Sequence, residues 1–178
     1  MTKTNTLFKS WLICGILFLA GCFNPFAPKL DNTNGPPIVI TPQRSPDEVL
    51  QNFVYAYTFK DSLVYADILD SSFVFVYFDP NIESSGRFVS WGRDIDLKTT
   101  GRLFKRYDTI TLTWNSTIYE DTTFVDTTIV DIELSKTLQL NLFGTSDEYT
   151  FSGSAVFNFK QCDDKKWRII RWKDESYM

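Results

Sequence analysis

The hydrophobic pattern changes its period once along the chain, and this change limits the folds that are open to it. From residue 109 to residue 172 apolar side chains alternate with polar ones, as in Ile110, Leu112 and Trp114, which are separated by threonines. A period of two places successive side chains on opposite faces of a strand, so the apolar face is buried and the polar face is exposed to solvent. Four strands of an antiparallel sheet are predicted, over residues 109–114, 130–142, 149–159 and 167–172.

The preceding part of the chain has a helical period. Ser45-Pro46-Asp47-Glu48 has the composition of a capping box with proline at the first helical position. The helix that it begins is expected to bury one stripe, formed by Leu50, Phe53, Val54 and Tyr57.

Two further helices and one more strand are expected before residue 109. A short helix begins at Asp61 or Ser62, and the strand follows over residues 73–78. A loop of about ten residues then leads to a helix over residues 91–105, capped by Ser90. The inward residues are expected to be Leu63, Ala66 and Leu69 in the short helix, and Ile95, Leu103 and Phe104 in the last one.

Aromatic residues make up 16% of the 178 residues, which are enough for one domain with a hydrophobic core. Such side chains favour strands, fill cores and line apolar cavities. The residues predicted to line a pocket are Tyr57, Trp91, Trp114 and Trp172. A cavity and a filled core use the same residues, so both interpretations stay open.

Charge and composition exclude several classes of function. The net charge is −4, and removal of residues 1–21, which contain Lys3 and Lys9 and no acid, changes it to about −6. An acidic body without a basic cluster argues against nucleic-acid binding. The chain has no histidine, so it contains no Ser-His-Asp or Cys-His site, and we expect neither a metal nor a cofactor.

The N-terminus has the organisation of a signal peptide over residues 1–21. Lys3 and Lys9 precede an apolar run of about ten residues, which is too short to span a membrane as a helix. Leu19-Ala20-Gly21-Cys22 follows and resembles the lipobox of bacterial lipoproteins. The resemblance implies cleavage between Gly21 and Cys22 and lipidation of Cys22.

A lipid-anchored protein of the cell envelope is therefore expected, because several acyl chains on one cysteine give stable attachment to a membrane. Phe23 stands where an aspartate would imply inner-membrane retention, so the resemblance implies the outer membrane if the organism has one. Residues 22–44 contain five prolines and are predicted to be a tether, in which residues 38–40 dock as an edge strand. The folded domain is placed at residues 45–178.

The order of these elements resembles that of the NTF2-like (SnoaL-like) superfamily. The likeness rests on the opening helix Ser45–Tyr57, on Phe59–Phe78, and on Ala155–Asp174, which contains Trp167-Arg168-Ile169-x-Arg171-Trp172-x-Asp174. The resemblance implies an α+β cone, in which a strongly curved antiparallel sheet wraps around about three helices and encloses an apolar cavity. It also implies that the sheet can form a homodimer.

The leading hypothesis is a domain that binds an apolar small molecule or a protein partner without catalysis. The alternative is a lyase or isomerase of the NTF2-like type, which acts on a hydrophobic substrate with a buried carboxylate. Asp67, Asp70 and Asp79 lie where such an acid is expected, although helix-surface and turn roles explain each of them. A third interpretation is a structural domain whose cone is filled by its own rings.

Overall fold

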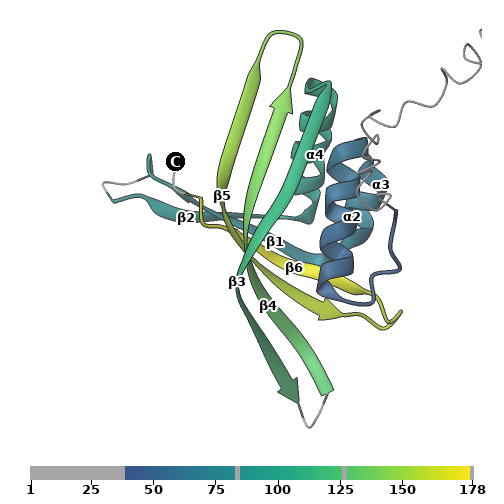
Figure 1. The fold of residues 1–178 in the computed structure, drawn as a ribbon. Helices are drawn as coiled ribbons and strands as arrows, with labels where there is room; N and C mark the ends of the chain where they lie inside the picture. Colours follow the sequence, from purple (N-terminus) through teal and green to yellow (C-terminus); the bar gives the residue numbers. More distant parts are fainter. Residues whose placement is uncertain (1–38, 83–84, 126–127, 177–178) are drawn as a thin grey trace, which may run out of the picture. The chain divides into compact units, whose positions relative to one another are not determined.

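The computed structural model describes residues 39–82, 85–125 and 128–176 (Figure 1). The compact unit that contains them begins at Ile38, and every buried apolar residue described lies between Val49 and Ile169. This unit therefore has its own hydrophobic core. The predicted signal peptide, the lipidation site and most of the tether lie outside the described residues.

The elements are α2 (Pro46–Phe59), α3 (Ser62–Ile68), β1 (Leu69–Asp79), β2 (Arg87–Gly92), α4 (Arg93–Arg106), β3 (Thr109–Val125), β4 (Thr128–Phe143), β5 (Glu148–Gln161) and β6 (Trp167–Asp174).

Helix α2 begins as predicted. The Ser45 hydroxyl accepts a hydrogen bond from the Glu48 amide at 3.3 Å, and the Glu48 carboxylate accepts one from the Arg44 amide at 2.7 Å. These bonds satisfy amides that have no partner inside the helix. Leu50, Phe53 and Tyr57 are buried as expected. The helix ends at Lys60, which has a left-handed conformation and donates its amide to α2 carbonyls.

Helix α3 is present, but its inward face differs from the predicted one. Leu63 is 83% exposed, whereas Tyr65 and Ile68 are buried. Leu69 is buried as expected, but as the first residue of β1 rather than as part of the helix. The spacing of apolar residues allowed two faces, and packing against α2 and α4 selects the one that contains the larger Tyr65 side chain.

The six strands of the described residues form one sheet in the order β2-β1-β6-β5-β4-β3. Four of the five neighbouring pairs are antiparallel as predicted, but β1 and β6 are parallel. This pair joins the first strand of the domain to the last, so a local sequence pattern carries no information about its direction. In Figure 1 the three helices lie together on one side of the sheet, and the end of the β3–β4 hairpin extends away from them. We call the helix side the inner face.

Strand β2 occupies part of the segment that was predicted to be a loop. Trp91 lies in this strand, in register with Phe75 of β1, rather than at the start of a helix. Helix α4 therefore begins two residues later than expected, with Gly92 instead of Ser90 at its N-cap. Its buried face contains Asp96 and Phe104, while Ile95 is 57% exposed. The prediction was correct for Phe104 and wrong for Ile95.

The residues just before α2 pack against the domain, although the predicted tether includes them. Thr41 donates its amide to the Asn52 side chain at 2.7 Å, and the Gln43 carbonyl accepts a bond from the Trp167 amide at 2.8 Å. The predicted edge strand is wrong within the described residues, because Val39 and Ile40 are exposed and form no strand. This segment docks through hydrogen bonds instead of apolar side chains. Ile38 lies outside the described residues.

Candidate functional site

A cluster of aromatic rings fills the deepest part of the space between α2 and the sheet. Phe53 lies at its centre, only 1% exposed. Its ring centroid is 5.5 Å from that of Trp114 and 5.4 Å from that of Trp172. The rings of Tyr57, Tyr65 and Phe157 lie within 6.2 Å of it. The chain's own side chains thus occupy this part of the cone.

A second group of rings continues from this cluster along the inner face toward the edge of the sheet. Phe75 stacks on Trp91 at 4.6 Å and meets Trp172 edge-on at 4.8 Å. Tyr77 lies 5.0 Å from Trp91. Tyr77, Trp91, Trp114 and Trp172 are only partly buried and come from four different strands. We call these four side chains the aromatic floor.

The structure brings three of the four predicted pocket residues to the aromatic floor, and Tyr57 lies elsewhere. The indole N–H of Trp114 donates to the Leu50 carbonyl at 3.1 Å, and that of Trp91 donates to Asp96 at 3.0 Å. The buried N–H of Trp172 has no partner among the residues that the structure describes. A buried donor without an acceptor costs free energy, so an acceptor on a ligand could satisfy it.

Tyr57 belongs to a buried polar cluster centred on Asp96, which the sequence reasoning missed. Asp96 is 4% exposed. One of its carboxylate oxygens accepts a bond from the Tyr65 hydroxyl at 2.6 Å, and the other accepts the bond from Trp91. The Thr100 side chain, one turn further along α4, forms hydrogen bonds with the hydroxyls of Tyr57 and Tyr65, and these bonds partly offset the increase in pKa that burial causes in the two tyrosines. The cluster joins α2, α3, β2 and α4.

Burial determines the titration of this cluster. It raises the pKa of Asp96, and the hydrogen bonds from Tyr65 and Trp91 only partly offset this effect. Burial also raises the pKa values of Tyr57 and Tyr65, and the charge of Asp96 adds to both increases. The cluster can therefore hold a proton on Asp96 at a higher pH than an ordinary carboxyl would.

The three acids considered as catalytic candidates have structural partners instead. Asp67 accepts hydrogen bonds from Lys166 and Gln43, both at 2.7 Å. Burial by itself would raise the pKa of Asp67, but these hydrogen bonds have the larger effect, so its pKa is lowered. Burial likewise raises the pKa of Asp70, and bonds from Ser72 reverse this effect.

Asp79, the third acid, accepts the Asn81 amide at 2.9 Å. This bond is typical of a turn that follows a strand. Asp67 and Asp79 therefore have the helix-surface and turn roles that the sequence allowed, whereas Asp70 lies in β1 rather than at a helix end or in a turn.

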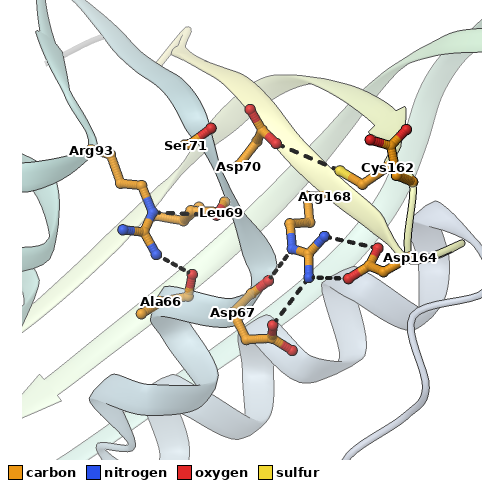
Figure 2. Close-up of a pocket in the computed structure, with 10 residues that line it drawn as sticks. Ala66, Asp67, Leu69, Asp70, Ser71, Arg93, Cys162, Asp164 and Arg168 are labelled. Atoms are coloured by element: carbon orange, nitrogen blue, oxygen red, sulfur yellow. Dashed lines mark hydrogen bonds and ion pairs between the residues drawn. The ribbon is translucent and has the colours of Figure 1, made fainter.

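An open polar pocket of about 590 Å³ lies at the end of α3 (Figure 2). Arg168 lies between Asp67 and Asp164 and donates to Asp164 at 2.7 Å and 3.1 Å. Arg93 donates to the carbonyls of Ala66 and Leu69. Arg168 is thus paired with two acids of this pocket, and Arg93 is held by main-chain carbonyls. Its lining residues are Ala66, Asp67, Leu69, Asp70, Ser71, Arg93, Cys162, Asp163, Asp164 and Arg168.

No protein-family model matches the sequence, and no curated protein matches it. Solved structures do match, and they show that the fold is NTF2-like, as expected from the resemblance. A proposed scytalone dehydratase from Novosphingobium aromaticivorans is 14% identical in sequence and matches with a TM-score of 0.60. The match covers 76% of this chain and 83% of the dehydratase chain. A proposed NTF2-like dehydratase from Streptomyces avermitilis is 13% identical with a TM-score of 0.55, covering 73% and 91%.

An NTF2-like superfamily protein from Salmonella enterica is 10% identical with a TM-score of 0.52, covering 74% of this chain and 87% of its own. Identities this low establish a common fold and nothing finer. None of the helices described is long and apolar enough to cross a membrane. In the same part of the chain, no three acidic or cysteine side chains converge in a way that could hold a metal ion.

Proposed function

We propose that this chain is the precursor of a lipid-anchored envelope protein whose NTF2-like domain binds an apolar small molecule without catalysis. Cleavage between Gly21 and Cys22 leaves Cys22 as the lipidated residue, and the lipid holds the domain at a membrane, the outer one if the organism has two. The signal-peptide organisation and the lipobox of the sequence support the anchor. The aromatic floor supports the binding function.

The observation that carries the binding proposal is the partial burial of the aromatic floor. Single Trp or Tyr side chains are often incompletely buried, so the signal is the gathering of four such rings from four strands, beside a core ring, Phe53, that is fully buried. Tyr77, Trp91, Trp114 and Trp172 are instead partly exposed on one face. Ligand sites are typically apolar and aromatic with a few polar groups, and the N–H of Trp172, which has no partner in the described part of the chain, is such a group.

The binding proposal is tested on residues 38–178, because Thr41 and Gln43 pack on the domain. The domain is purified under native conditions, and mass spectrometry identifies any apolar molecule that co-purifies. Binding of the apolar fluorophore N-phenyl-1-naphthylamine is then measured by titration. A protein that contains no co-purified molecule and does not bind the fluorophore would contradict the proposal.

Replacing Trp172 by leucine is expected to weaken fluorophore binding about tenfold, because a stacking surface on the aromatic floor is lost. Phe88→Leu is the matched control: Phe88 pairs with Phe78 on the outer face and is 54% exposed. Its replacement should leave the affinity unchanged. Equal losses in the two variants would place the site away from the aromatic floor.

The anchor leads to a separate prediction. In a bacterial host, Cys22→Ala should abolish incorporation of labelled palmitate and release the protein from the membrane fraction, because no other residue accepts the lipid. Cys14→Ala is the control, since Cys14 lies within the predicted signal peptide and should not affect labelling. Membrane attachment that survives Cys22→Ala would mean that something other than the lipid holds the protein.

The second candidate function is a lyase or isomerase, and Asp96 is the observation that favours it. Its buried carboxylate has a raised pKa and faces the Tyr65 hydroxyl, as proton transfer to a hydrophobic substrate would require. If a co-purified molecule is converted by the domain, Asp96→Asn should abolish turnover. Both carboxylate oxygens already accept bonds from the protein, so a substrate would have to replace one of them.

A protein partner remains the alternative to a small molecule. Phe78 and Phe88 are exposed on the outer face with centroids 5.4 Å apart, and they would be covered in a homodimer formed through the sheet. Sedimentation of the domain across a range of concentrations would detect such a dimer.

A further inference from the structure

The chain does not leave the sheet where β6 ends at Asp174. The Glu175 amide donates to the Ser154 carbonyl of β5 at 2.9 Å, so the C-terminal segment stays beside β5. The Ser176 amide donates to the Asp174 carboxylate at 2.9 Å, which turns the backbone. Lys173 and Glu175 form an ion pair at 2.6 Å. These contacts position residues 174–176, which we call the C-terminal strap.

The strap passes directly over Gly153. A Cβ atom at this position would lie 1.8 Å from the Ser176 hydroxyl oxygen, 2.5 Å from its Cβ and 3.1 Å from its Cα. Atoms do not approach this closely, so any side chain at residue 153 would displace the strap. The absence of a side chain at Gly153 therefore creates the space in which Ser176 lies.

The register of the sheet shows which face the strap covers. Gly153 is opposite Leu138, and it shares a face with Ala155 and Phe157, two residues of the buried core. Trp172 is opposite Phe157 in the β5–β6 pair. Because paired residues share a face, Ser176 of the strap lies on the inner face, together with Trp172 of the aromatic floor. Lys173 is opposite Val156 and over the Phe88 ring, so its ion pair with Glu175 lies on the outer face.

We infer that the C-terminal strap controls the access of a ligand to the aromatic floor. This inference rests on the proposed binding function and concerns its regulation. Among the described residues, one main-chain hydrogen bond, one turn and one partly exposed ion pair hold the strap. A segment held by so few contacts opens at low free-energy cost, so the strap can open while the core stays folded.

The test compares three variants of residues 38–178. Gly153→Ala places a Cβ against Ser176 and should displace the strap. Gly101→Ala is the control for the same chemical change, because nothing lies within 4 Å of a Cβ at that helical position. In Gly153→Ala/Ser176→Gly the two closest atoms of Ser176 are removed, so the strap should return with a small adjustment.

Two measurements are made on each variant. Hydrogen exchange reports on the Glu175 amide, which should lose protection in Gly153→Ala and regain it in the double variant. Stopped-flow mixing with N-phenyl-1-naphthylamine reports on access, and association should be about fivefold faster in Gly153→Ala. Gly101→Ala should match the wild type in both measurements.

The outcomes separate the strap from the binding function. If all variants bind the fluorophore at the wild-type rate although Glu175 has lost protection in Gly153→Ala, the strap does not control access and the inference is wrong. A Glu175 amide that exchanges freely in the wild-type domain would overturn it as well. If no variant binds the fluorophore, the proposed binding function itself fails, and the regulatory role fails with it.

Discussion

Replacing Phe53 by alanine is expected to lower the free energy of unfolding of the domain by about 4 kcal/mol. Phe53 packs against rings from α2, α3, β3, β5 and β6, so its removal leaves a cavity that several rigid elements surround. Such a cavity cannot close by moving a single side chain. Urea unfolding of residues 38–178, followed by circular dichroism, measures the loss.

Phe59→Ala is the matched control for Phe53→Ala. Phe59 lies on the same helix and is 56% exposed, with its ring 4.7 Å from that of Tyr55. Its removal should cost less than about 1 kcal/mol. Similar losses in both variants would mean that Phe53 is not the centre of the core, and that the arrangement of rings around it is wrong.

The second large effect is expected for Asp96→Ala, which should lower the free energy of unfolding at pH 7 by about 3 kcal/mol. The substitution leaves the Tyr65 hydroxyl and the Trp91 indole N–H without the acceptor that each has in the wild-type protein. Water cannot replace the carboxylate easily, because Tyr65 is fully buried. Asp94→Ala, at an exposed position of the same helical turn, is the control and should have a much smaller effect.

Asp96→Asn separates hydrogen bonding from charge. The amide oxygen can accept the Trp91 bond and the amide nitrogen can donate to the Tyr65 oxygen, so most of the stability should remain. The raised pKa of Asp96 means that the folded state keeps a proton that the unfolded state has lost. Wild-type stability should therefore fall as the pH rises from the ordinary value of 3.8 toward the raised pKa, and stay level above it.

Asp96→Asn should lack this pH-dependent component, because it has no carboxyl to titrate at that position. The measurement is the free energy of unfolding of both proteins at a series of pH values. Parallel pH profiles for the two proteins would show that Asp96 titrates normally and is not held in a desolvated site.

The elements with strong local signals were predicted correctly. The capping box at Ser45 placed the start of α2, and the alternation from Ile110 onward placed β3 to β6, although β3 continues to Val125, well beyond the predicted end at Trp114. A cap forms within one helical turn, and alternation reflects which face of a strand is buried, so both can be read from neighbouring residues. The NTF2-like fold was predicted from the resemblance of their order to that of a known superfamily.

The candidate site was predicted only in part. Trp91, Trp114 and Trp172 lie together on the inner face, since large aromatic residues in alternating strands point to the core, and their role in lining a pocket stays a prediction. Asp96 was missed because the ordinary preference for apolar burial selected its neighbour Ile95. The one available signal was helical spacing, since Asp96, Thr100 and Phe104 are four residues apart and share a face.

By itself, the sequence determined that the C-terminal half forms strands with one apolar face and that a capped helix precedes them, but it left open whether aromatic side chains fill the space between. These properties depend on residues a few positions apart. Only the tertiary structure decided the parallel pairing of β1 with β6, the burial of Asp96 and the position of the strap over Gly153. Each of these depends on contacts between distant segments. The Asp96 carboxyl can be buried only because Tyr65 and Trp91 donate hydrogen bonds to it. The direction of a strand pair is set only when the fold brings the two strands together.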